Sequence, residues 1–325
     1  MSQTLEEKSS TSVRYLDIGE EAGQRIDNYL MARLPGVPKS RIYRIIRRGE
    51  VRVNGGRIKP TYRLSAGDRV RVPPLHLATR PPPAVGQRDL ARIEAAIIFE
   101  NERLLVLNKP AGVAVHGGSG VSYGIIEGLR RLRPEARLEL AHRLDRETSG
   151  CLLVAKGRQS LLEIHAALRE RTVRKRYEVI VHGRWPGNVR TVRLPLKKYS
   201  TSSGERRVRV DAQGKPSRTD FEVVGRSEAA TWLVAHLHTG RTHQIRVHAK
   251  ASGHEVVGDE KYGKPEQRAL EGRLGISGMC LHAEGITLVL NGEKYKFSCP
   301  VPDTFAAAWE RLSEDVDPLG SEHDA

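Results

Sequence analysis

A carboxylate flanked by arginines is the feature of this sequence best suited to chemistry. In "AHRLDRETSGCLLVA", residues 141–155, Asp145 lies between Arg143 and Arg146, and a polar turn then leads into an apolar run. Guanidinium groups that face a carboxylate favour its ionised form and lower its pKa. Such a carboxylate could act as a nucleophile or as a base. The alternative is an ion pair in a surface loop, which is the more common use of such residues.

Two further clusters could take part in the same chemistry. The stretch "HTGRTHQIRVH", residues 238–248, groups polar donors where a strand pattern gives way to a helical one. These candidates are Arg241, His243, Gln244 and Arg246. In "VRKRYEVIV", Tyr177 opens a strand-like run directly after three cations. An aromatic ring among cations can stack a nucleobase while the cations hold phosphates. Taken alone, Tyr177 is more typical of an ordinary β-sheet tyrosine.

The sequence lacks the patterns of metal, nucleotide-cofactor and serine-hydrolase sites. His243 and His248 lie five residues apart, which places them on different sides of a helix, and no cysteine is near them. The glycine-rich tract at residues 115–120 lacks the ending of a phosphate-binding loop. A nucleophile at Ser149 or Cys151 is disfavoured, because no GxSxG elbow is present and Cys151 opens an apolar strand. We therefore expect neither a metal nor a cofactor.

Much of the positive charge is concentrated near the N-terminus. The chain of 325 residues has 54 lysines and arginines against 39 acids, which gives a net charge of +15. Residues 38–72 hold eleven of the basic residues and two acids, and so carry nine of the net charges. A face made only for solubility normally mixes both signs, so this imbalance favours binding to a phosphate backbone over a merely solvated surface.

The basic segment shows the pattern of a helix followed by a hairpin. In "KSRIYRIIRRGE", residues 39–50, the isoleucines recur at helical spacing and the arginines form a separate stripe. Strand-like alternation follows, with Asn54 and Gly55 as the turn. The candidate contacts to a phosphate backbone are Lys39, Arg41, Arg44, Arg47, Arg48 and Arg52.

We expect two domains joined by a proline-rich linker. A small module over residues 20–75 precedes a linker over residues 76–94, which shows neither helical nor strand periodicity. Residues 95–310 alternate strand-like runs with fewer helical stretches, which predicts an α+β domain on a mixed, mainly antiparallel sheet. An acidic tail is expected at residues 311–325. The three separated cysteines, with no signal-like or membrane-spanning segment, place the protein in the cytoplasm, with a monomer as the default.

Taken together, these motifs resemble those of the RluA-type pseudouridine synthase family. "HRLDRETSG", "RKRYEVIV" and "TGRTHQIRVH" are similar to its aspartate, tyrosine and arginine motifs, and "LNKPAGVAVHGGSG" and "LHA" match in order. The first module, with "GQRIDNYL" and "VPKSRIYRIIRRGEVRVNGGRIKP", resembles the RNA-binding domain named after ribosomal protein S-four. The resemblance covers about residues 20–300. Stretches such as "IEGLRRLRPEAR" are most similar to members that act on the large ribosomal subunit.

The resemblance implies an enzyme that isomerises uridine to pseudouridine within 23S ribosomal RNA, its expected partner, without a cofactor. It implies that Asp145 is the catalytic aspartate, either a nucleophile at the anomeric carbon or a base toward the ribose 2′ proton. Arg143 would enter the RNA stack beside the flipped base, and Tyr177 would pack against the uracil. Arg246 would pair with Asp145 and keep it ionised. The other candidates for substrate contacts are His116, His142, Arg241, His243 and Gln244.

Two alternatives stay open on the sequence. The same chemistry could act on other rRNA or tRNA uridines, and a non-catalytic ribosome-binding or assembly protein could use the same basic module. Intact Asp145, Tyr177 and Arg246 argue against the non-catalytic alternative.

Overall fold

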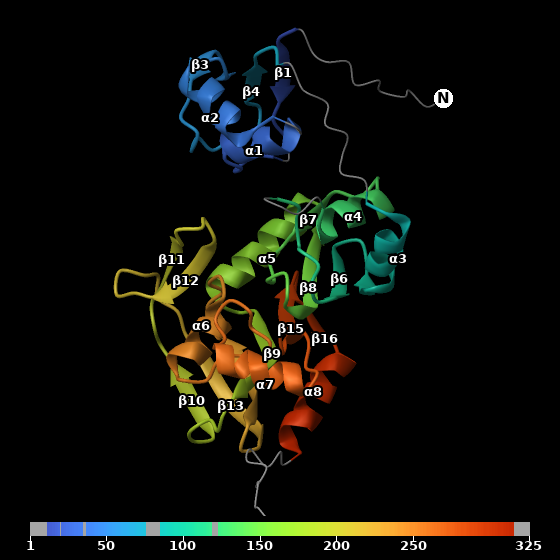
Figure 1. Cartoon of the computed structure of the whole chain (residues 1–325). Helices are drawn as coiled ribbons and strands as arrows, with labels where there is room; N and C mark the ends of the chain where they lie inside the picture. Colours follow the sequence, from blue (N-terminus) through green and yellow to red (C-terminus); the bar gives the residue numbers. More distant parts are fainter. Residues whose placement is uncertain (1–11, 20, 35–36, 76–84, 119–122, 315–325) are drawn as a thin grey trace, which may run out of the picture. The chain divides into compact units, whose positions relative to one another are not determined.

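The chain folds into two compact units, residues 1–84 and 85–325. The computed structural model describes residues 12–19, 21–34, 37–75, 85–118 and 123–314 (Figure 1). Among the helices of these residues, none has the length and apolar content needed to cross a membrane.

The first unit is a small α+β module with its own core. Its elements are β1 (Arg14–Asp17), α1 (Ile26–Arg33), α2 (Lys39–Arg47), β2 (Arg52–Val53), β3 (Gly56–Arg57) and β4 (Arg69–Val72). The strands form an antiparallel sheet in the order β1-β4-β2-β3. The isoleucines of α2 are buried in one core with Val53 and Val70, as the helical spacing predicts. Because β1 pairs with β4, the unit begins upstream of the predicted boundary at residue 20.

The predicted linker and tail both need correction. Residues 76–84 lie outside the described residues, but Gln87–Ala95 form the helix α3. This helix buries a single apolar anchor, Ile93, in the core of the second unit, and half of its other residues are charged, so it shows no apolar periodicity. At the other end, residues 311–313 complete α8 (Asp303–Ser313), and the remainder of the predicted acidic tail, from residue 315, lies outside the described residues.

A large mixed sheet forms the centre of the second unit. Its strands are β5 (Ile97–Glu100), β6 (Leu104–Lys109), β7 (Leu138–Leu140), β8 (Ser149–Lys156), β9 (Arg174–His182), β10 (Val189–Val192), β13 (Thr219–Arg226), β14 (Ala230–Leu237), β15 (Leu281–Leu290) and β16 (Glu293–Ser298). The order is β10-β13-β14-β9-β15-β8-β6-β5, with β16 on β15 and β7 on β8. Only the β15–β8 pair of this sheet is parallel. The predicted α+β fold class with a mainly antiparallel sheet is confirmed.

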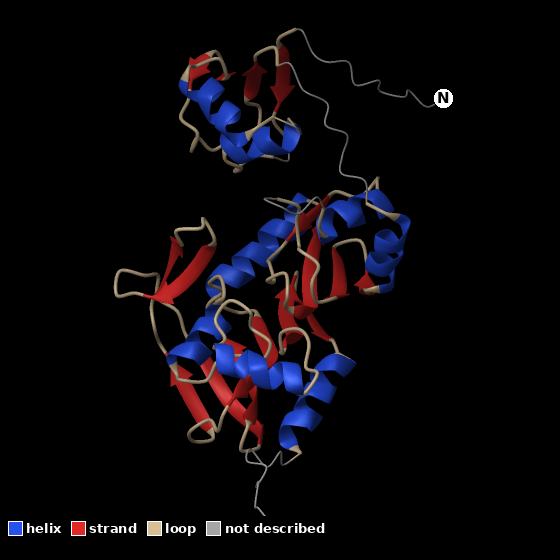
Figure 2. Ribbon diagram, viewed as in Figure 1, coloured by secondary structure: helices blue, strands red, loops and turns tan. Residues whose placement is uncertain are grey.

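Helices pack around this sheet, and a separate hairpin projects from it (Figures 1 and 2). Besides α3 and α8, the helices are α4 (Ile125–Leu132), α5 (Arg158–Glu170), α6 (Gln244–Ala251) and α7 (Pro265–Arg273). The hairpin consists of β11 (Leu196–Ser200) and β12 (Arg206–Val210). Its buried Leu196 and Val208 pack with Val247 of α6 and with Tyr262. The hairpin therefore packs beside the helix that contains Arg246 and the second half of the arginine motif.

Strand β8 is buried on both faces, which explains its uninterrupted apolar sequence. Leu152 and Val154 face one core cluster, which includes residues of α4. Cys151, Leu153 and Ala155 face the other, which includes residues of α5. Since β8 is fixed from both sides, the loop that precedes it, which contains Asp145, has a rigid base.

Gly150 marks the point where this loop enters the sheet. It has a φ of 103°, and a Cβ built on it would lie 2.3 Å from the carbonyl oxygen of Ala283 in the parallel strand β15. Both the backbone angle and the close approach require glycine here. A side chain would push β8 and β15 apart next to the Asp145 loop.

The substitution Gly150→Ala is therefore expected to lower the free energy of unfolding by about 3 kcal/mol, from left-handed strain plus overpacking. Gly157→Ala is the matched control, because Gly157 also has a positive φ (90°) but no atom within 4 Å of a built Cβ. It should cost about 1–2 kcal/mol, from backbone strain alone. Denaturant unfolding measures both, and equal losses would contradict the role of the close β15 contact.

Candidate active site

The candidate site is a cavity of about 330 Å³ in the second unit. This volume lies at the small end of ligand pockets, so it suits one nucleoside rather than a duplex. It is lined by His142, Arg143, Leu144, Asp145, Thr148, Leu168, Lys175, Tyr177, Leu237, Gly240, Arg241, Thr242, His243, Gln244, Ile245, Arg246 and Leu281. The three motifs that the sequence separates therefore meet around one hollow.

Asp145 is held by Arg246, as the resemblance implies. Arg246 Nη1 donates to Asp145 Oδ2 over 3.2 Å. The rest of the guanidinium forms a bidentate pair with Asp259, with Nε–Oδ2 at 2.6 Å and Nη2–Oδ1 at 2.7 Å. Arg246 is 4% exposed and Asp259 is 2% exposed. Although burial opposes its charge, the bonds to Asp259 and Asp145 raise the pKa of Arg246 above its ordinary value.

Asp259 is a site residue that the sequence did not single out. It accepts the backbone N–H groups of Lys261 and Tyr262 in addition to the Arg246 pair. A buried carboxylate held by this many donors fixes the plane of the guanidinium. In sequence Asp259 stands in the polar stretch "GDEKYG", residues 258–263, which gives no indication of its partners.

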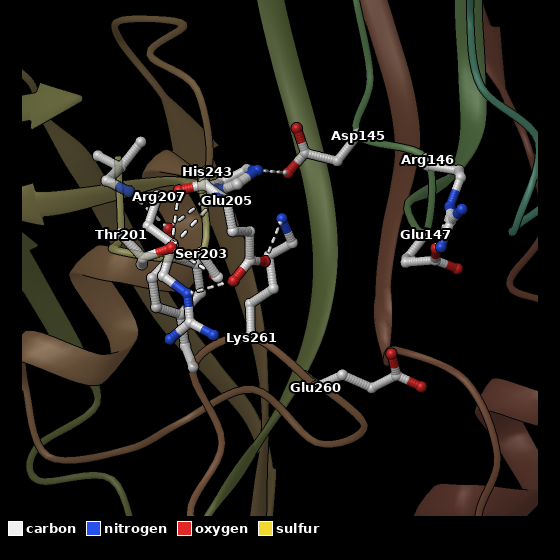
Figure 3. Close-up of polar contacts among 12 residues, drawn as sticks. Asp145, Arg146, Glu147, Thr201, Ser203, Glu205, Arg207, His243, Glu260 and Lys261 are labelled. Carbon is white, nitrogen blue, oxygen red and sulfur yellow. Dashed lines mark hydrogen bonds and ion pairs between the residues drawn. The ribbon is translucent and has the colours of Figure 1, made fainter. Parts of the chain in front are cut away.

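His243 approaches Asp145 from the other side of the cavity. Its Nε2 lies 3.8 Å from Asp145 Oδ2, and its Nδ1 lies 2.7 Å from the hydroxyl of Tyr262. Figure 3 shows the His243 side chain turned toward Asp145. Burial lowers the pKa of His243 to about 4, in spite of the opposing effect of Asp145. The ring is therefore neutral at pH 7.

Tyr177 and Lys175 line the wall formed by β9. Tyr177 is 7% exposed, and burial, reinforced by the charge of Asp145, raises the pKa of its phenol. Its hydroxyl therefore keeps its proton at neutral pH. Burial also lowers the pKa of Lys175, whose ammonium lies near Gly240. Lys175 was considered only as a flanking cation, but it contributes to the cavity itself.

The two arginines next to Asp145 do not neutralise it. Arg146 Nε donates to Glu147 Oε1 over 2.6 Å, and Figure 3 shows this pair pointing away from Asp145. Arg143 is exposed at the cavity edge and forms no ion pair with the described residues. Its guanidinium is therefore open to solvent at the edge of the cavity. The guanidinium that contacts Asp145 thus comes from Arg246, which lies 101 residues away in sequence.

A buried lysine fixes the loop behind Asp145. Lys109, which is 0% exposed, donates to the carbonyl oxygens of Pro110, Val113 and Arg146 at 2.8, 2.8 and 3.0 Å. Burial lowers the pKa of its ammonium to about 7, whereas three carbonyl acceptors favour the charged form. Through Arg146, this lysine ties the "LNKPAG" segment to the loop that presents Asp145.

His142 is used as a structural acceptor as well as a cavity residue. Its Nε2 accepts the backbone N–H of Leu153 over 3.0 Å. Burial, with a contribution from Lys175, lowers the pKa of His142 to about 3. The ring is therefore neutral in the folded protein at all but strongly acidic pH.

This lowered pKa predicts a pH-dependent stability. Between pH 6.5 and about 3, the unfolded chain binds a proton at His142 that the folded chain does not. The contribution of neutral His142 to the free energy of unfolding is therefore fully present above pH 6.5. It decreases on acidification, by up to about 1.4 kcal/mol per pH unit. In His142→Gln, whose amide oxygen can still accept from Leu153, this part of the slope should be absent. Unfolding free energies of both proteins from pH 7 to 4 provide the test, and parallel curves would contradict the assignment.

The remaining candidates for substrate contacts lie in different environments. Gln244 is 3% exposed, and both its amide hydrogens and its oxygen are bonded inside the protein, to Arg218, Thr219, Thr239 and Arg241. Its amide group therefore shapes the turn before α6. Arg241 is exposed on the cavity wall and also lines a neighbouring hollow. His116 is exposed and is not part of the cavity lining.

The alternative nucleophiles have internal roles. Ser149 Oγ lies 2.8 Å from Nδ1 of His282, whose Nε2 contacts the carbonyl oxygen of Cys299 over 3.0 Å. Cys151 is a free thiol and is 2% exposed. Its hydrogen bond with the thiol of Cys299, together with burial, raises its pKa. Among the residues that the structure describes, no group of three or more His, Cys, Asp and Glu side chains is placed to hold a metal ion.

The cationic candidates of the first unit fall on its surface. Lys39, Arg44, Arg47, Arg48 and Arg52 are exposed, and Arg41 is partly buried. Arg52 donates to the carbonyl oxygens of Gly49 and Gly55, which orients it. The stripe of α2 is thus available for phosphate contacts.

Comparison with known proteins decides the family. A model described as RNA pseudouridylate synthase matches residues 103–251, and a model of the S4 domain matches residues 24–70. The ribosomal large subunit pseudouridine synthase C of Pasteurella multocida (strain Pm70) is 52% identical over 308 residues, which cover 93% of this chain and 94% of that protein. The chain belongs to the RNA pseudouridylate synthase family.

Other relatives of this pseudouridine synthase agree. The protein with the same description from Escherichia coli (strain K12) is 49% identical over 300 residues, covering 90% of this chain and 94% of that protein. A solved structure, human RNA pseudouridylate synthase domain containing 1, is 30% identical with a TM-score of 0.54, and the match covers 64% of this chain and 83% of that chain. The segment matched by the synthase model includes Asp145, Tyr177 and Arg246.

Proposed function

We propose that this pseudouridine synthase isomerises specific uridines of 23S ribosomal RNA, as a cytoplasmic monomer. The observation that carries the proposal is the carboxylate of Asp145, held at a nucleoside-sized cavity by a buried arginine. The large-subunit substrate is supported by the names of the relatives from Pasteurella and Escherichia coli. The S4 domain, with its exposed cations, would supply sequence-independent affinity for the RNA backbone.

In this reaction the N-glycosidic bond of uridine breaks, the base rotates, and a carbon–carbon bond forms from C5 to the same sugar carbon. A proton leaves C5 and another is bound at the freed nitrogen, so the atoms balance without an oxidant or reductant. Asp145 acts as nucleophile at the anomeric carbon or as base toward the 2′ proton, and in both roles the hydrogen bond from Arg246 orients its carboxyl group. Because Tyr177 keeps its phenolic proton, its hydroxyl can donate a hydrogen bond beside the uracil.

The β11–β12 hairpin offers RNA a set of unpaired cations next to the cavity. On one face of the hairpin, the cations Lys197, Arg207 and Arg209 each pair with a nearby acid. The opposite face contains the buried Leu196 and Val208, and it also carries Lys198 and Arg206, which are exposed and form no ion pair with the described residues. Lys198 lines a hollow that shares Gly240, Arg241 and Thr242 with the catalytic cavity. These two cations are placed to hold phosphates that flank the target uridine.

Reversing the two unpaired charges tests this contact. The double substitution Lys198→Glu and Arg206→Glu is expected to raise KM for RNA about tenfold or more and to flatten its salt dependence, with little change in kcat. The control is Arg207→Glu with Arg209→Glu on the opposite face, which changes the net charge equally at two positions that do not line this hollow. If both double variants raise KM to the same extent, the hairpin acts through net charge alone. Lys198 and Arg206 would then not contact the flanking phosphates as proposed.

The function itself is tested by mapping pseudouridines. Purified protein is incubated with unmodified large-subunit RNA, small-subunit RNA and tRNA, and the modified positions are read by reverse transcription after pseudouridine-specific labelling. We expect a few defined positions in the large-subunit RNA and none in the others. Modification confined to tRNA or small-subunit RNA would contradict the substrate, and no modification of any RNA would contradict the activity.

A further inference from the structure

Tyr262 connects the β11–β12 hairpin to the catalytic aspartate. The backbone N–H of Val208 in β12 donates to the Tyr262 hydroxyl oxygen over 2.9 Å, and that oxygen lies 2.7 Å from His243 Nδ1. The other ring nitrogen of His243, Nε2, lies 3.8 Å from Asp145 Oδ2, and Figure 3 marks this contact. A chain of polar groups thus runs from the hairpin backbone to the carboxylate.

These contacts decide which nitrogen of His243 carries its proton. The Tyr262 oxygen accepts the Val208 N–H, so the hydrogen of its own hydroxyl needs an acceptor. Within the described part of the chain, His243 Nδ1 is the acceptor at hydrogen-bond distance. A neutral imidazole has a single N–H, so an Nδ1 that accepts leaves this hydrogen on Nε2. Nε2 is the nitrogen that faces Asp145.

We propose that Tyr262 is a positioning residue that holds His243 in its Nε2–H tautomer, so that a neutral donor faces Asp145 opposite the charged donor Arg246. The opposite tautomer would set the Nε2 lone pair against the carboxylate. At 3.8 Å the Nε2–H group does not hydrogen-bond to Asp145, but its dipole faces the carboxylate without adding the second positive charge that would weaken it as a nucleophile or base. The effect on rate rests on the proposed function, whereas the tautomer is a property of the protein alone.

The surroundings hold this arrangement in place. His243 has a φ of 53°, a left-handed conformation that costs a non-glycine residue about 1–2 kcal/mol and so requires external support. Tyr262 is 5% exposed, and the guanidinium of Arg246 lies 5.1 Å from the centre of its ring. Next to it, Lys261 Nζ lies 2.8 Å from Glu205 Oε1 at the end of the hairpin turn. Two consecutive residues therefore tie the hairpin to the active site.

The tautomer can be measured directly. In protein labelled with ¹⁵N-histidine, we expect His243 Nδ1 to resonate as an unprotonated nitrogen and Nε2 as a protonated one at pH 7. Tyr262→Phe removes the hydroxyl but keeps the ring over Arg246, and it should move the two resonances toward each other as both tautomers become populated. His243→Gln assigns the signals by removing them. Tyr295→Phe, which deletes a hydroxyl bonded to Glu293, should leave both resonances unchanged.

Kinetics then connect the tautomer to catalysis. Tyr262→Phe is expected to lower kcat about fivefold to tenfold with KM unchanged, because the donor beside Asp145 is lost for part of the molecules. In a His243→Gln background, the same Tyr262→Phe change should have no further effect on kcat, since Tyr262 acts through His243. Tyr295→Phe should keep the wild-type kcat.

Each result decides the proposal. A wild-type His243 protonated on Nδ1, or resonances unmoved by Tyr262→Phe, would overturn the assigned tautomer. The positioning role would be overturned if Tyr262→Phe shifted the tautomer but left kcat unchanged. It would also be overturned if Tyr262→Phe lowered kcat equally in the wild-type and His243→Gln backgrounds. If the wild-type protein modified no RNA, the proposed function would fail, while the resonances would still decide the tautomer.

Discussion

Asp145→Asn is expected to reduce pseudouridine formation by about 10⁴-fold or more, because the amide can act neither as a nucleophile nor as a base. The amide oxygen can still accept from Arg246 Nη1, so the fold and RNA affinity should change little. Single-turnover assays on the large-subunit RNA measure the rate, and filter binding measures the affinity.

Glu163→Gln provides the matched control for this acid-to-amide change. Glu163 lies on α5, pairs with Arg103 over 3.2 Å, and is not part of the cavity. It should keep the wild-type rate. If Asp145→Asn retained more than about one tenth of the activity, the carboxylate would not be the reacting group and the catalytic assignment would fall.

Arg246→Met should have the largest effect on both stability and activity. It leaves Asp259, which is 2% exposed, as a buried carboxylate without its guanidinium partner. Breaking a buried pair in this way costs about 3–5 kcal/mol, so the free energy of unfolding should fall by that amount. Asp145 loses its charged donor as well, so the activity should be lost even under conditions where the variant is folded.

Arg218→Met tests the part that burial plays. Arg218 forms an equivalent bidentate pair with Asp220, at 3.0 and 2.9 Å, but its side chain is 39% exposed. Its loss should cost less than about 1 kcal/mol, as is usual for surface pairs. Denaturant unfolding of the two variants measures the difference, and similar losses would show that the Arg246–Asp259 pair is not protected from solvent as the structure indicates.

The sequence predicted most of the architecture because its signals are periodic and local. The α2 isoleucines and the apolar run of β8 are patterns that a single element produces, and both elements are present. The helix α3 was missed because it needs only Ile93 as a buried anchor, and one anchor gives no period. The proline-rich stretch before it then extended the predicted linker too far.

The candidate site was predictable only in part, for a different reason. Asp145, Tyr177 and Arg246 stand in recognisable motifs, and the structure brings them to one cavity. Asp259 and Tyr262 act through partners that are set by tertiary packing, so nothing near them in sequence indicated their contacts. Arg146 is the opposite case, because its closeness to Asp145 in sequence suggested a contact that does not form. It pairs with Glu147 instead.

The bond between Ser149 and His282 has a consequence for how the enzyme matures. It joins residues 133 positions apart, and the parallel pairing of β8 with β15 depends on the same distant segment. Contacts of such long range form late, because the loop between them must first be closed. Leu281, at the start of β15, is also part of the cavity wall. A nascent chain that has emerged only as far as residue 280 therefore contains Asp145, Tyr177 and Arg246 but lacks the β15 part of the cavity wall, so we expect no activity before that strand has been made.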